Sequence, residues 1–164
     1  MTSLQPDQWH DLFIAVAGAA AALTGLIFVA VSINLKQIIE YPGLPHRAVE
    51  TLAVMTGVLL LSVFVLIPGQ SRQALGIETL LLGGIAGGFL LVKRLRMPRK
   101  KDDPLVWTAA PLAVVLAGSV PMVAGGISLL ADGGGGLYWF AAESMAGFVA
   151  VIFNAWILLV EIQR

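Results

Sequence analysis

The sequence contains no cysteine among its 164 residues, so disulfides, thiolate metal ligands and cysteine nucleophiles are excluded. Histidine is nearly as scarce: His10 and His46 lie far apart, and they give little support to a zinc or haem site built on histidine pairs. Charged residues make up 12% of the chain, about half of the share of roughly 25% in soluble domains. The ten basic and ten acidic residues cancel, so no net field favours nucleic acid as a partner.

Hydrophobic residues, in contrast, make up 58% of the chain, and 18 glycines accompany them. A soluble domain of this length has too little interior to hide so much apolar surface in one core. A disordered chain is also excluded, because disorder requires few apolar residues and many charges. The composition therefore predicts an integral membrane protein.

Five stretches are long and apolar enough to cross a bilayer core, for which a helix needs about 20 residues. They are residues 12–35, 48–67, 74–92, 105–131 and 137–160. Each run is continuous, whereas the strands of a membrane barrel alternate between apolar and polar residues. The predicted fold class is therefore all-α: a five-transmembrane-helix bundle that forms a single transmembrane domain over residues 1–164.

The basic residues are distributed very unevenly between the two sides of such a bundle. Five spans place the two termini on opposite sides, and the side of the N-terminus holds only Arg72. The other side holds nine basic residues: Lys36, Arg47, Lys93, Arg94, Arg96, Arg99, Lys100, Lys101 and Arg164. Because short basic loops stay in the cytoplasm, we expect a multi-pass protein of the cell membrane with its N-terminus outside and its C-terminus cytoplasmic. The segment from Lys93 to Lys101 is expected to lie against anionic inner-leaflet lipid.

Small residues recur at helical spacing in three of the spans, and small residues let helices approach closely in lipid. They include Gly18 and Gly25 in the first span, Gly83, Gly84, Gly87 and Gly88 in the third, and Gly147 in the fifth. We expect these faces to look into the bundle as helix-packing surfaces. The alternative is that one of them binds a second copy or another membrane protein, or lines a passage.

The fourth span contains two prolines, Pro111 and Pro121. Each removes a backbone donor and frees the carbonyl group four residues earlier, at Trp107 and Ala117. A kinked or locally unwound helix at mid-membrane provides a hinge or a cation ligand. The alternative is a structural kink whose carbonyl groups are satisfied by neighbouring helices.

Every span has an acidic residue near its N-terminal end, where the helix dipole favours negative charge. Glu78 and Glu143 are placed deeper, roughly 6–10 Å below the outer boundary, with no basic residue at their depth. They are therefore candidates for a cation or proton site, with solvated structural acids as the alternative. Asn154 lies on the same side of its helix as Glu143, and we expect it to be an interhelical hydrogen-bond donor rather than a ligand.

The sequence has none of the HExxH, GxSxG or P-loop motifs, nor a GxGxxG that follows a strand. We therefore expect neither an enzyme nor a resident cofactor or metal. Two function classes remain open. The first is an oligomeric cation or proton pathway that uses the outer-leaflet carboxylates and is gated at the fourth span. The second is a non-conducting, regulatory membrane partner that packs on another membrane protein through the glycine-rich helix faces.

Overall fold

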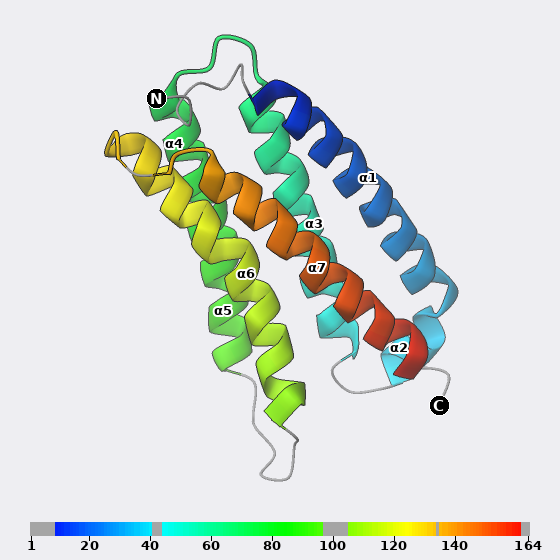
Figure 1. The fold of residues 1–164 in the computed structure, drawn as a ribbon. Coiled ribbons are helices and arrows are strands. Elements are labelled where there is room, and N and C mark those ends of the chain that lie inside the picture. Colours follow the sequence, from blue (N-terminus) through cyan, green and yellow to red (C-terminus); the bar gives the residue numbers. More distant parts are fainter. Residues whose placement is uncertain (1–8, 41–43, 97–104, 134, 162–164) are drawn as a thin grey trace.

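The computed structural model describes residues 9–40, 44–96, 105–133 and 135–161. Within these ranges all of the regular structure is helical (Figure 1). The elements are α1 (His10–Ile33), α2 (Leu35–Glu40), α3 (Leu44–Leu66), α4 (Arg72–Leu81), η3 (Leu82–Ala86), α5 (Gly87–Leu95), α6 (Leu105–Leu130) and α7 (Tyr138–Glu161).

Five helices are long and apolar enough to cross a membrane, which confirms the prediction at that level. They are His10–Ile33, Leu44–Leu66, Arg72–Lys93, Leu112–Leu130 and Tyr138–Trp156. The third combines α4, η3 and α5, and η3 is a π-helical segment in its middle. The chain also forms a short helix, α2, which the hydropathy pattern assigned to a loop.

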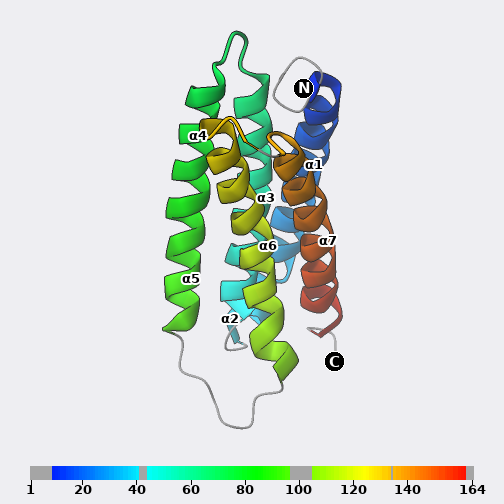
Figure 2. The same ribbon diagram turned by 60° about the vertical axis from the view of Figure 1, so that its left-hand side comes forward.

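The helices run side by side between an upper and a lower end, as seen in Figures 1 and 2. Helix α3 is central, because it packs against α1, α7 and α6. Helix α6 in turn lies against α7 on one side and the α4–η3–α5 span on the other. Helix α1 begins at the upper end and α7 finishes at the lower end.

The loops at the upper end are held by local hydrogen bonds. The Ser71 hydroxyl caps α4 by accepting a bond from the Ala74 N–H at 3.1 Å, a role that serine favours. The Ser128 hydroxyl accepts a bond from the Gly136 N–H at 2.9 Å and fixes the turn between α6 and α7. An exposed ion pair between Arg72 and Asp132, 2.6 Å long, links the two loops.

Several of the glycines predicted to mediate packing lie at helix contacts. A Cβ atom on Gly147 would lie 3.1 Å from Val58 of α3, and one on Gly83 would lie 3.2 Å from Met122 of α6. Gly87 likewise lies directly against Ser119. A Cβ atom would clash at Gly87, whereas at Gly147 and Gly83 the neighbouring side chains would have to shift by a few tenths of an ångström.

The expectation that all of the small-residue faces look into the bundle is wrong. Gly18 and Gly25 lie on the exposed side of α1, and a Cβ atom at either position would meet no other group within 4 Å in the described structure. Gly84 and Gly88 also point into open space. The spacing of small residues identified the covered faces and the open faces alike. It did not show which faces are covered by a neighbouring helix of the same chain.

Candidate binding cleft around Glu143

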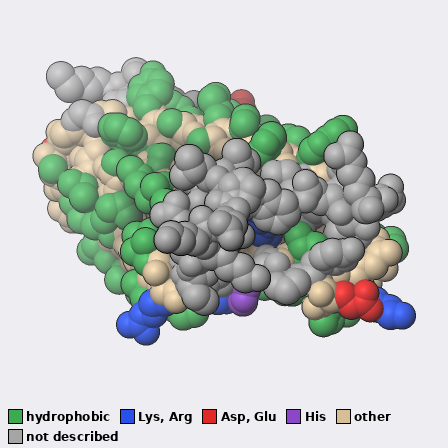
Figure 3. Space-filling model, turned by 90° about the horizontal axis from the view of Figure 1, so that it is seen from below, with side chains coloured by type: hydrophobic (Ala, Val, Ile, Leu, Met, Phe, Trp, Pro, Cys, Tyr) green, Lys and Arg blue, Asp and Glu red, His purple; other side chains and the backbone are tan. Residues whose placement is uncertain are grey.

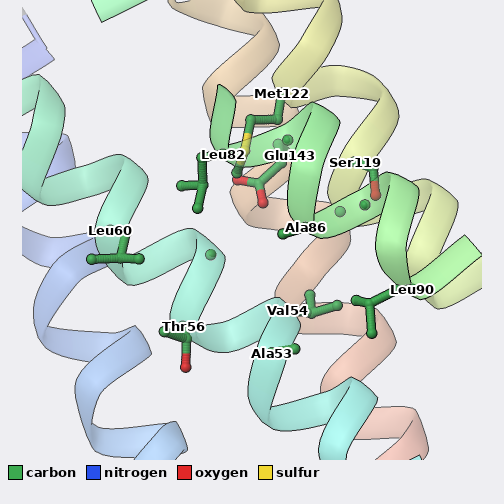
Figure 4. Close-up of a pocket in the computed structure, with 14 residues that line it drawn as sticks. Ala53, Val54, Thr56, Leu60, Leu82, Ala86, Leu90, Ser119, Met122 and Glu143 are labelled. Atoms are coloured by element: carbon green, nitrogen blue, oxygen red, sulfur yellow. The ribbon is translucent and has the colours of Figure 1, made fainter. Parts of the chain in front are cut away.

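A cleft of about 290 Å³ lies near mid-height in the bundle, between α3, the η3–α5 segment and α6. Its walls are mainly aliphatic side chains and glycines, and Glu143 of α7 contributes a carboxyl group (Figure 4). The labelled lining residues are Ala53, Val54, Thr56, Leu60, Leu82, Ala86, Leu90, Ser119, Met122 and Glu143. A mainly apolar pocket with a few polar groups is typical of small-molecule sites.

Glu143 lies in the second turn of α7, on the side that faces the other helices. Its side chain is 1% exposed. The hydroxyl of the adjacent Ser144 donates to the Phe140 carbonyl at 2.9 Å, and Glu143 Oε2 has no hydrogen-bond partner among the residues that the structure describes. Because a buried carboxylate without compensation costs several kcal/mol, this group requires a proton or a cationic partner.

The other polar groups of the cleft wall are hydroxyl groups that are already used within their own helices. The Ser119 hydroxyl donates to the Val115 carbonyl at 2.6 Å, and the Thr56 hydroxyl donates to the Leu52 carbonyl at 2.8 Å. The described residues include no group of three or more His, Cys, Asp or Glu side chains that would hold a metal ion. Glu143 is therefore the group that gives the cleft its chemistry.

The irregular backbone of the bundle lies at this cleft. Residues Leu82–Ala86 form the π-helical segment η3, and π-helical bulges are frequent at functional sites. Helix α6 stays continuous from Leu105 to Leu130, through Pro111 and Pro121. Of the two readings of the fourth span, local unwinding is not seen within α6, and the third span carries an irregular turn instead. Pro121 still leaves the Ala117 carbonyl without its usual helical donor, and Ala117 directly precedes Gly118 of the cleft wall.

Glu78 and Glu143, the two carboxyl groups named as candidates for a cation or proton site, do not both line the cleft. Glu78 accepts a hydrogen bond from Gln70 Nε2 at 2.5 Å, and Glu78 is not part of the cleft lining. The glutamine bond holds it near the loop between α3 and α4. Of the two predicted carboxylates, only Glu143 faces the cleft.

Asn154 donates an interhelical hydrogen bond, as its position on the same side of α7 as Glu143 predicted. Its Nδ2 donates to Thr51 Oγ1 and to the Arg47 carbonyl, the latter at 3.4 Å. Thr51 Oγ1 in turn donates to the Arg47 carbonyl at 2.7 Å. Asn154 lies 11 residues after Glu143, roughly 16 Å along α7. Its amide therefore binds α3 far from Glu143.

A buried polar cluster near the lower end, formed by Arg47, Glu50, Thr51 and Asn154, was not predicted from the sequence. Arg47 was expected on the cytoplasmic side in a loop, whereas it lies in the first turn of α3 and is 6% exposed. The i, i+3 and i+4 spacing of the three α3 residues was the available signal.

The lower end itself is viewed directly in Figure 3. Among the described residues, it shows Lys and Arg side chains at separate places, one of them beside an acidic side chain. Lys93 and Arg96 belong to this end, whereas residues 97–101 of the predicted basic segment lie outside the described residues. The side chains of Arg94 and Pro111 lie outside the description as well.

Comparison of the chain with protein-family models, curated proteins and solved structures finds no match.

Proposed function

We propose that this chain is a multi-pass protein of the cell membrane that forms or contributes to an oligomeric proton or cation pathway, with Glu143 as its binding group. The observation that carries the proposal is the buried Glu143 carboxyl group, which faces a cleft near mid-height and has an oxygen atom without a partner in the described structure. Ionisable groups inside membrane helices are costly, and they commonly mark ion pathways.

The uneven distribution of basic residues supports an orientation with the N-terminus outside and the C-terminus in the cytoplasm. In this orientation the upper end of Figure 1 faces outward. Glu143 then lies about 8 Å below the start of α7, within the outer leaflet. Lys93 and Arg96 face the cytoplasm, where they would contact anionic inner-leaflet lipid.

A proton is the better supported ion. Metal cations such as Ca²⁺ and Mg²⁺ take about six oxygen ligands, whereas the cleft wall provides a carboxyl group, two hydroxyl groups and mainly aliphatic side chains. A proton needs only one oxygen atom of Glu143. The chemistry of the site therefore favours reversible protonation over coordination of a metal ion.

A layer of apolar contacts separates Glu143 from the polar cluster at Asn154. Gly147 packs there against Val54, Met55 and Val58. A proton on Glu143 therefore reaches the cytoplasmic side only if α7 and α3 move apart or a second copy completes the route. The open faces at Gly18 and Gly84 are surfaces on which a second copy would pack closely.

Proton flux into liposomes that contain the purified protein tests this function. Under an imposed pH gradient, the wild-type protein should acidify the lumen, and Glu143→Gln should abolish this flux while the protein stays folded. Glu78→Gln is the matched control, because Glu78 is a carboxyl group with its own partner outside the cleft. It should retain most of the flux.

The same open glycine faces favour a second candidate function, that of a non-conducting membrane partner that docks on another membrane protein. Wild-type protein that carries no proton flux at any pH, together with a stable co-purifying membrane protein, would overturn the pathway and support the partner.

A further inference from the structure

The cleft beside Glu143 opens on the side of the bundle rather than at either end. Thr56 and Leu60 on α3 and Ala86 on η3 line it and are also exposed on the outer surface. Thr56 and Ala86 lie near the middle of their membrane-spanning helices, and Leu60 lies one turn from Thr56, still well inside its helix. Helices α3 and η3–α5 both rest on α6, and the cleft occupies the space between them. In a bilayer, its mouth therefore faces the hydrocarbon.

This lateral opening restricts what can reach the carboxyl group from the side of the bundle. A hydrated inorganic cation is excluded from that route by the cost of losing its water. A neutral, apolar molecule dissolves in the bilayer and approaches the cleft from the side. The lateral opening therefore admits a lipid-soluble ligand.

The size of the cleft limits that ligand. Its volume of about 290 Å³ is roughly twice that of a 150 Å³ apolar cavity that holds one benzene molecule. A ligand of roughly a dozen non-hydrogen atoms is the largest that such a volume holds comfortably. One aromatic ring with a short side arm meets this limit.

The carboxyl group of Glu143 determines which polar group the ligand should carry. In an apolar wall, the carboxyl group forms a charge-assisted hydrogen bond with a nitrogen that can carry positive charge. Figure 4 shows its oxygen atoms among Leu82, Met122 and Ala86, so a ligand in the cleft meets carbon on most sides, and Glu143 is the ionisable group that it meets.

We propose that this cleft binds a small lipid-soluble primary amine, which enters neutral from the bilayer and pairs with Glu143. The proton of the Glu143 carboxylic acid moves to the lone pair of the amine, which gives an ammonium and a carboxylate, and no other reactant is consumed. The inference rests on the proposed role of Glu143 as a proton-binding group and names the class of ligand that exchanges with that proton.

Equilibrium dialysis of the full chain in phosphatidylcholine nanodiscs tests this proposal with phenethylamine as the probe. Ethylbenzene, which has the same ring and arm but no nitrogen, is the matched neutral ligand. Wild type and Glu78→Gln should bind phenethylamine with affinities that agree within about twofold. Glu143→Gln should bind it roughly ten- to a hundredfold more weakly, the range for loss of one charge-assisted bond.

Ethylbenzene reports whether the cleft is intact in each variant. It should bind equally to wild type and Glu143→Gln, which shows that the variant keeps its fold. Ala86→Leu places a larger side chain at the mouth and should weaken both ligands several-fold. Equal phenethylamine affinity for Glu143→Gln and wild type, or no saturable binding to wild type, would overturn the proposal.

The outcomes for the amine and for the proton pathway can be separated. Proton flux that requires Glu143, without phenethylamine binding, would remove the amine site and leave the pathway in place. Phenethylamine binding that requires Glu143, without any proton flux, would keep the amine site and remove the pathway.

Discussion

Leucine in place of Gly147 tests whether α7 packs on α3 through its small-residue face. A Cβ atom at this position would lie 3.1 Å from Val58 and 3.7 Å from both Met55 and Val54. The three further carbon atoms of leucine would have to enter the same contact. Gly18→Leu is the matched control, because a Cβ atom there meets no other group within 4 Å in the described structure.

The difference between the two variants isolates the cost of packing. Both replace a mid-helix glycine by leucine, so the gain in helix propensity, about 0.8–1 kcal/mol, is common to both. Adding carbon atoms to a well-packed contact costs about 1–3 kcal/mol. Gly147→Leu should therefore be less stable than Gly18→Leu by about 1–3 kcal/mol.

Reversible unfolding in mixed detergent micelles gives the free energy of unfolding of each variant. Equal stabilities for the two variants would refute the packing of α7 on α3, and with it the position of Glu143 beside the cleft. Cross-linking of the same samples measures whether the face of α1 that carries Gly18 binds a second copy of the chain. If its face binds a second copy, Gly18→Leu should reduce the dimer without reducing the stability of the monomer.

Two further predictions concern the polar contact of Asn154 and the membrane orientation. A double-mutant cycle of Asn154→Leu and Thr51→Val should give a coupling energy of about 0.6 kcal/mol, and about 1.7 kcal/mol is the upper limit for such contacts in membrane proteins. Unfolding in mixed micelles measures this coupling energy. A value of zero would contradict the hydrogen bond between the two side chains. Single cysteines placed next to the two termini of this cysteine-free chain should react with an impermeant maleimide from opposite sides of the membrane. Reaction of both cysteines from the same side would contradict five crossings with the N-terminus outside.

The helical architecture was largely predictable, because a continuous apolar run of about 20 residues satisfies its backbone hydrogen bonds in lipid by forming a helix. The five long helices lie close to the five predicted ranges. The short helix Leu35–Glu40 was not predicted, because its mixture of apolar and charged residues follows the first span without a strong stop signal. The π-helical turn at Leu82–Ala86 was missed as well, since Gly83 and Gly84 are equally compatible with a regular helix.

The candidate site was only partly predictable. Depth along a helix identified Glu143 as an unusual acid, and its spacing from Asn154 placed both on one face. Depth did not reveal that Glu78 is bound by Gln70, because that bond depends on how the loop after α3 folds back. Nor did the sequence show that Arg47 is buried, since a basic residue at a span boundary normally stays in the interface.

The sequence by itself determined that the chain is helical, that five segments are long enough to cross a membrane, and which residues are small, charged or deep. These properties are local, because they depend on composition and on the period of one helix. The tertiary structure decided that Gly147 and Gly83 are covered whereas Gly18 and Gly84 are open, and that Glu143 faces a cleft that Glu78 does not reach. Those outcomes depend on which helices become neighbours. A small residue can contact either another helix or lipid, so its spacing along one helix does not decide which of the two it meets.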